Sequence, residues 1–142
     1  MEKEKWDLLI SKAKEVQEHI VISPFIESGQ VAAAILTKNG NIYAGVCIDT
    51  ACTLGICAER NAIHNMITNG ESKIEKIVCI DSNGNVDYPC GACRELIMQL
   101  DIDSKNIQFL TDTKTYEYTT MGELIPNWWG YTRFEQEKNT NN

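Results

Sequence analysis

Two short cysteine-containing segments constrain this chain most, because each lies where a helix is predicted to begin. The first is Cys57-Ala-Glu-Arg60 and the second is Pro89-Cys-Gly-Ala-Cys-Arg94. The free N–H groups and partial positive charge of a helix N-terminus favour thiolate over thiol, and thiolate is the form that binds a metal ion. Cys90 and Cys93 are one helical turn apart, so they can reach one ion together.

The pattern around these segments predicts an α/β fold. Apolar residues at helical spacing predict helices over residues 5–20, 57–68, 90–100 and 120–125. Apolar runs bounded by turn residues predict strands over residues 31–37, 41–48, 76–80, 106–110 and 115–119. The Asn-Gly pair of Lys38-Asn-Gly40 predicts a hairpin between the first two strands. Strands that alternate with helices indicate a layered sheet.

Length and charge set the broad class of protein. The 142 residues suit one domain, expected over residues 1–134 and followed by a polar tail over 135–142. An excess of 20 Asp and Glu over 13 Lys and Arg gives a net charge of −7, which repels phosphate backbones and argues against a nucleic-acid partner. We find no signal peptide or membrane span and expect a soluble cytoplasmic protein, in which six cysteines are thiols or metal ligands rather than disulfides.

Three thiolates on Zn²⁺ leave one coordination position open, as a catalytic zinc site requires. Glu59 lies two residues beyond Cys57 and could move protons without binding the metal. Arg60 and Arg94 could offset the thiolate charge by hydrogen bonding to sulfur. Two alternatives are a structural zinc site closed by Cys52 or His64, and a redox pair formed by Cys-Gly-Ala-Cys.

Together the two segments resemble the cytidine deaminase superfamily, in its small homotetrameric three-cysteine branch, whose signature is a ligand-x-Glu followed by Pro-Cys-x-x-Cys. The resemblance implies a three-layer α/β/α fold with a central mixed five-stranded sheet. It implies one Zn²⁺ per chain held by Cys57, Cys90 and Cys93. It also implies that Glu59 shuttles protons, that Arg60 neutralises the thiolates, and that a cytosine ring loses ammonia by hydrolysis.

The chain departs from this family where the sugar is bound. Relatives that act on nucleosides carry Asn-x-Glu-Asn after the second strand, whereas this chain has Cys47-Ile-Asp-Thr50. Asp49 could still accept a hydrogen bond from a ribose hydroxyl. Blasticidin S deaminase, a relative that acts on a cytosine-bearing antibiotic, also lacks the motif. By the same resemblance Trp129 would pack on the substrate ring of a neighbouring subunit, and Phe25 would lie near the pyrimidine.

We therefore predict a zinc-dependent aminohydrolase that acts on a free small molecule, cytidine or deoxycytidine, in pyrimidine salvage. A blasticidin S deaminase and a non-catalytic nucleoside-binding protein are the alternatives. Editing of RNA or DNA is disfavoured by the charge. The expected partners are the small-molecule substrate and three further copies of the chain, with active sites at the subunit interfaces, and neither a nucleic acid nor a membrane.

Overall fold

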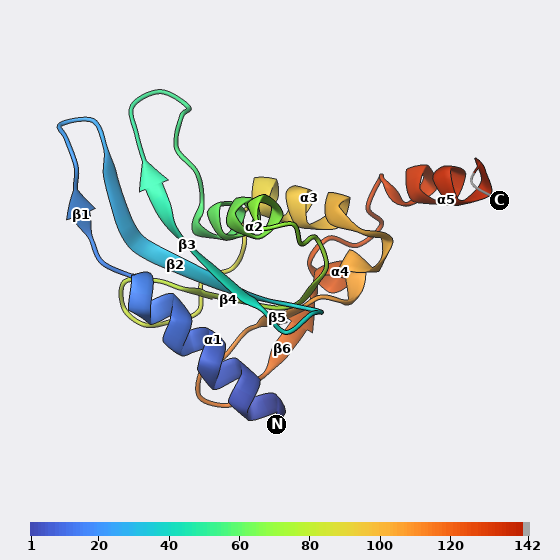
Figure 1. Cartoon of the computed structure of the whole chain (residues 1–142), viewed down its shortest axis with the longest axis horizontal. Helices are drawn as coiled ribbons and strands as arrows, with labels where there is room; N and C mark the ends of the chain where they lie inside the picture. Colours follow the sequence, from blue (N-terminus) through green and yellow to red (C-terminus); the bar gives the residue numbers. More distant parts are fainter. Residues whose placement is uncertain (141–142) are drawn as a thin grey trace.

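The computed structural model describes residues 1–140 as an alternation of helices and strands (Figure 1). The helices are α1 (Glu2–Val16), α2 (Ala58–Thr68), α3 (Gly91–Leu100), the 3₁₀ turn η1 (Ile102–Asn106), α4 (Met121–Leu124) and α5 (Tyr131–Thr140). The strands are β1 (Ile20–Val21), β2 (Glu27–Thr37), β3 (Ile42–Asp49), β4 (Ile74–Ile80), β5 (Gln108–Leu110) and β6 (Tyr118–Thr120).

The strands form one mixed sheet centred on β2. One edge of β2 pairs with β3, while its other edge pairs with β1 near its start and with β4 further along. The order then continues through β5 to β6, and only the β4–β5 pair is parallel among the described strands. The sheet therefore has six strands within residues 1–140 rather than the expected five, because the two-residue strand β1 was not predicted.

Helices cover both faces of the sheet, which confirms the predicted three-layer α/β/α arrangement (Figure 1). Side chains alternate along a strand, so Ala32 and Ala34 face α1 while Ala33 and Ile35 face α2 and α3. Gly45 of β3 packs directly under α2, where a Cβ atom would lie 2.4 Å from the backbone nitrogen of Ala62. This close approach fixes the position of α2, and with it the position of the first cysteine segment.

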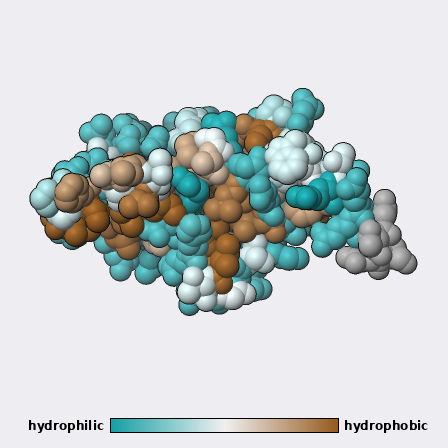
Figure 2. Space-filling model, turned by 90° about the horizontal axis from the view of Figure 1, so that it is seen from above, coloured by the Kyte–Doolittle hydropathy of each residue, from teal (hydrophilic) through white to brown (hydrophobic). Residues whose placement is uncertain are grey.

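β1, the start of β2 and the loop after β3 project beyond the helical layers as an arm of the molecule (Figure 1). The register of β2 shifts between Ser28 and Ala32, and Gly29 lies there at φ +87°. A Cβ atom at Gly29 would overlap the carbonyl of Glu18, so this position requires glycine. Apolar side chains gather at the arm end of the molecule (Figure 2). The exposed ones are Ile20, Val21, Ile22, Phe25 and Leu54.

Two of the predicted boundaries that differ from the structure have clear causes, one in long-range contacts and one in a local turn. α1 ends at Val16 rather than near residue 20, since the Gln17 amide donates to the carbonyls of Ile80 and Asp81 and holds the chain against the sheet. The last strand starts at Tyr118 rather than residue 115, since Asp112 accepts backbone hydrogen bonds in a turn.

The C-terminal segment is helical where a polar tail was expected from residue 135. α5 spans Tyr131–Thr140, and residues 141 and 142 of that tail lie outside the described part of the chain. The assignment of residues 1–134 to a single domain stays a prediction. Within the described residues, no helix is both long and apolar enough to span a membrane.

Candidate metal centre

The three predicted cysteine ligands lie together at the starts of α2 and α3. Cys57 is the N-cap residue of α2 and Cys90 is the N-cap residue of α3, and Cys93 follows in the first turn of α3. The Cys57 and Cys90 sulfurs are 3.4 Å apart, those of Cys90 and Cys93 are 3.3 Å apart, and all three lie within 4.8 Å of one another. Two helix N-termini on one face of the sheet thus converge on one point.

This donor set fits one zinc ion. Tetrahedral coordination with zinc–sulfur distances of about 2.3 Å separates the sulfurs by roughly 3.8 Å, which is close to the observed spacing. Thiolates are the soft ligands that zinc prefers. Among the described residues the cluster contains three ligands, and neither Cys52 nor His64 belongs to it. Three protein ligands leave one coordination position for water or substrate, as in catalytic rather than closed structural sites.

The three thiols differ in their electrostatic surroundings. Burial raises the pKa of Cys57, although a hydrogen bond from Arg60 opposes it. Burial is also the largest cause of the raised pKa of Cys93, and the nearby charge of Glu59 raises it further. Burial at Cys90 disfavours the thiolate and would raise its pKa. Hydrogen bonds to the sulfur, the strongest from the backbone N–H of Cys93, outweigh this effect, and the pKa of Cys90 is lowered. A bound cation would favour the thiolate form of all three.

Glu59 points into the protein from the first turn of α2. Its side chain is only 4% exposed and lies beside the thiol of Cys79 on β4. Burial is the main cause of its raised pKa, and the charge of Asp87 adds to the effect. Cys79 is fully buried, and nothing in the sequence pattern around it points to a contact with this carboxyl group.

The two arginines have different partners. Nη2 of Arg60 lies 3.6 Å from the sulfur of Cys57, as predicted, whereas its buried Nε has no hydrogen-bond partner among the described residues. The prediction for Arg94 is wrong. Its guanidinium donates to the carbonyls of Pro89 and Leu124, at 2.9 and 2.7 Å, because the helix directs this side chain toward the C-terminal segment rather than toward sulfur.

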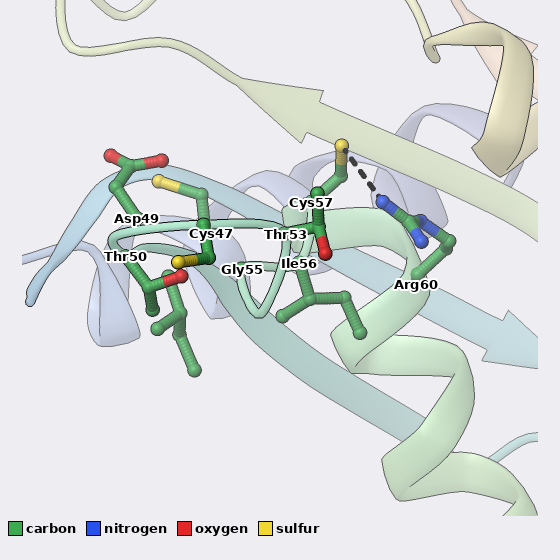
Figure 3. A pocket seen from close by; sticks show the side chains of 10 residues that line it. Cys47, Asp49, Thr50, Thr53, Gly55, Ile56, Cys57 and Arg60 are labelled. Atoms are coloured by element: carbon green, nitrogen blue, oxygen red, sulfur yellow. Dashed lines mark hydrogen bonds between the residues drawn. The ribbon is translucent and has the colours of Figure 1, made fainter.

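A pocket of about 340 Å³ opens beside the cluster, between the end of β3 and the start of α2 (Figure 3). Cys57 and Arg60 lie at one end of it and Asp49 at the other. Its further lining comes from the segment that replaces the family's sugar motif and from the loop after it. These residues are Cys47, Ile48, Thr50, Cys52, Thr53, Gly55 and Ile56. The structure thus places Asp49 and one of the three cysteines, Cys57, around one cavity.

Phe25 and Trp129 do not line this pocket. Phe25 is 71% exposed in the turn of the arm. Trp129 is 60% exposed next to the buried Trp128, so it is Trp129 that faces outward, which the sequence could not decide. Both indole N–H groups donate to Glu95 of α3, a residue that the sequence analysis missed because an acidic residue on a helix surface is commonplace.

Comparison with known proteins identifies the family. The model of the cytidine and deoxycytidylate deaminase zinc-binding region matches residues 3–110. The chain belongs to this family. The cytidine deaminase of Mycoplasma pneumoniae is 31% identical over 133 residues, which cover 92% of this chain and 96% of that protein.

A second relative and a solved structure extend the comparison. The blasticidin-S deaminase of Bacillus cereus is 34% identical over 105 residues, or 68% of this chain and 74% of the relative. The crystal structure of cytidine deaminase from Mycobacterium leprae matches with a TM-score of 0.71 at 27% identity, over 86% of this chain and 98% of that one.

Family and geometry together confirm the predicted class of enzyme. The protein is a zinc-dependent deaminase, and Cys57, Cys90 and Cys93 could hold one zinc ion. The family match accounts for both cysteine segments, whereas a thioredoxin-like redox pair leaves Cys57-Ala-Glu59 unexplained. It also favours a catalyst over a non-catalytic binding protein on the same scaffold.

Proposed function

We propose that this deaminase converts cytidine and deoxycytidine to uridine and deoxyuridine with release of ammonia. The observation that carries the proposal is the three-sulfur cluster with a buried carboxyl group, Glu59, in the helical turn that follows Cys57. An open pocket, lined by both polar and apolar side chains, adjoins the cluster at Cys57. The cytidine deaminases among the relatives support the choice of substrate.

In this proposal Cys57, Cys90 and Cys93 hold the zinc and Glu59 moves the protons. A zinc ion held there would lower the pKa of a water molecule, so that a hydroxide nucleophile for C4 of the ring would be available near neutral pH. Glu59 accepts the proton that the water loses and donates it to N3 of the cytosine. It then takes the remaining proton from the oxygen added at C4 and delivers it to the amino group, so that the C4–N bond breaks and ammonia leaves. Burial keeps Glu59 fixed and away from bulk water during these transfers.

Arg60 balances the charge of the site. Three thiolates and Zn²⁺ carry a net charge of −1, which makes the metal a weaker acid than a site that contains histidine. The contact between Arg60 and the Cys57 sulfur withdraws part of that negative charge. The buried Nε of Arg60 remains available to a further acceptor on the same side of the cluster.

Asp49 is the proposed contact to the sugar. It lines the pocket from the end opposite Cys57, and its exposed carboxylate can accept hydrogen bonds from ribose hydroxyls (Figure 3). The hydroxyls of Thr50 and Thr53 add donors and acceptors to the same lining. These groups would replace the Asn-x-Glu-Asn motif that the chain lacks.

The second candidate is deamination of blasticidin S. The relative from Bacillus cereus with that activity in its name matches this chain at 34% identity. Its match covers a smaller part of the chain than the match to the Mycoplasma pneumoniae cytidine deaminase, 68% against 92%. We therefore rank the nucleosides first.

Ammonia release by zinc-loaded protein decides between these substrates when cytidine, deoxycytidine and blasticidin S are offered side by side. We expect turnover of both nucleosides. Turnover of blasticidin S alone would overturn the nucleoside assignment in favour of the second candidate. Absence of turnover on all three, with zinc bound, would reject both.

We further propose a homotetramer in which Trp129 and Phe25 contact substrate bound at a neighbouring copy. The exposed apolar side chains of the arm and the outward indole of Trp129 support this arrangement, since such groups are commonly covered by a partner. Light scattering should give four times the monomer mass, and a monomer would reject the role of both aromatic residues. We assign the activity to pyrimidine salvage in the cytoplasm, where six free cysteines remain reduced.

A further inference from the structure

The carboxylate of Glu95 is the shared acceptor of a small cluster next to the metal centre. Nε1 of Trp128 lies 3.1 and 3.2 Å from its two oxygens, and Nε1 of Trp129 lies 2.9 Å from Oε1. The amide of Gln99 donates to Oε2 at 2.9 Å. An indole has only this one donor, so Glu95 satisfies the whole hydrogen-bonding capacity of both tryptophans.

The two indoles are held to different extents. Trp128 is 6% exposed and packs against the rings of Tyr131 and Phe134 at centroid distances of 5.4 and 5.9 Å. A Cβ atom at Gly130 would overlap its ring, so the chain leaves room for Trp128 by using glycine. The ring of Trp129 is tilted against Trp128 at a centroid distance of 5.7 Å and donates a hydrogen bond to Glu95, but 60% of the residue is exposed.

Glu95 connects this aromatic pair to the metal centre through α3. It lies two residues after Cys93 on the same helix. The intervening Arg94 joins the carbonyl of Pro89, next to Cys90, to the carbonyl of Leu124 before the tryptophans. Consecutive side chains therefore attach the C-terminal segment to the helix that carries two of the sulfurs.

We infer that Glu95 is a positioning residue, which fixes the outward-facing ring of Trp129 so that it can pack on the pyrimidine bound at a second copy of the chain. The inference rests on the proposed function for the role of Trp129 and adds the residue that orients it. Without Glu95 the ring would have to be ordered when substrate binds, which weakens binding and leaves the proton transfers by Glu59 unchanged.

Four variants test the inference through KM and kcat for cytidine. Trp129→Ala should raise KM about 5- to 100-fold, the usual range for loss of one aromatic–base stack. Glu95→Leu, and Trp129→Phe, which keeps a ring but loses the N–H, should each raise KM about 2- to 10-fold at nearly constant kcat. Glu95→Gln keeps an oxygen acceptor and should restore a KM near the parent value.

A double variant separates positioning from general damage. If Glu95 acts through Trp129, then Glu95→Leu should add nothing to KM in a Trp129→Ala background. Gln99→Ala is the matched control, because it removes the third donor from the same carboxylate without touching an indole. An unchanged KM in both Glu95→Leu and Trp129→Phe overturns the inference, and so does a fall in zinc content or kcat with Glu95→Leu.

Circular dichroism gives a readout that does not depend on activity. The exciton signal of the two neighbouring indoles should weaken in Glu95→Leu and persist in Glu95→Gln and Gln99→Ala, and Trp129→Phe, which removes one indole, gives the baseline without it. If the parent protein fails to turn over cytidine, the proposed function fails, and this signal still decides whether Glu95 orders Trp129. An exciton signal unchanged by Glu95→Leu overturns the inference even in an active enzyme.

Discussion

A single chain supplies all the residues of the metal centre, whereas it supplies only part of the proposed substrate-binding surface. The three sulfurs lie within 4.8 Å of one another and Glu59 is buried beside them. Phe25 and Trp129, by contrast, are both exposed and lie outside the pocket that adjoins the cluster. The chain therefore brings the three sulfurs together from two helix N-termini on one sheet, whereas the proposed contacts of the two exposed aromatic residues require a neighbouring copy.

The largest expected effect comes from a change inside the metal centre. Cys90→Ala removes the sulfur that lies between the other two, and we expect loss of zinc, of activity and of stability, since metal binding is coupled to folding. The loss of activity should exceed the roughly 10- to 100-fold that changes outside the ligand set cost. Metal analysis of the purified variant measures the zinc.

Cys52→Ser is the matched control for this variant. Cys52 is an exposed thiol that lines the same pocket but stands outside the three-sulfur group. It should keep one zinc per chain. If Cys90→Ala keeps its zinc as well, Cys90 is not a zinc ligand, and the proposed three-cysteine zinc site within one chain is rejected.

Glu59→Gln separates proton transfer from metal binding. The amide keeps the size of the side chain in its buried site but can no longer accept and deliver the proton, so kcat should fall about 10²- to 10⁴-fold while the zinc content stays constant. Single-turnover assays with zinc analysis on the same sample measure both. Glu15→Gln, an exposed carboxyl on α1, serves as the control. A kcat within threefold of the parent would remove Glu59 from the mechanism.

The same contrast explains which parts of the molecule the sequence predicted. Both cysteine segments can be recognised from local spacing, because residues three apart at a helix start, such as Cys90 and Cys93, are neighbours whatever the rest of the chain does. Periodicity predicted the alternation of helices and strands, and the family resemblance implied the three layers. Neither predicted the position of Arg94, since its side chain ends at Leu124, which is 30 residues away in the sequence.

The arm and the aromatic pair were beyond prediction for a related reason. Strand β1 has only two residues, and its pairing with β2 depends on the register shift at Gly29 rather than on any apolar repeat. Trp128 and Trp129 are adjacent and chemically identical. Which of them is buried is decided by Tyr131 and Phe134 of α5, a helix whose polar sequence was interpreted from residue 135 as a tail.

Asp49→Ala tests the part of substrate binding that one chain does supply. Loss of a charged hydrogen-bond acceptor should raise KM for cytidine about tenfold with little change in kcat. A substrate that lacks the 2′- and 3′-hydroxyls, 2′,3′-dideoxycytidine, provides the control, because the parent and the variant should bind it equally if Asp49 contacts those hydroxyls. If the variant weakens both substrates to the same extent, Asp49 shapes the pocket without contacting the sugar.

The smallest effect is expected from a change at Phe25. This change tests whether a neighbouring copy of the chain contributes to substrate binding. Phe25 is exposed in the turn of the arm, so Phe25→Ala should change the free energy of unfolding of one chain by less than about 0.5 kcal/mol. If a second copy brings this ring to the pyrimidine, KM should still rise about two- to fivefold. The exposed Leu54, changed to Ala, controls for loss of apolar surface on the same arm. A KM that Phe25→Ala leaves unaltered in an intact tetramer would show that the ring does not reach the substrate, and the substrate-binding part contributed by a neighbour would reduce to Trp129.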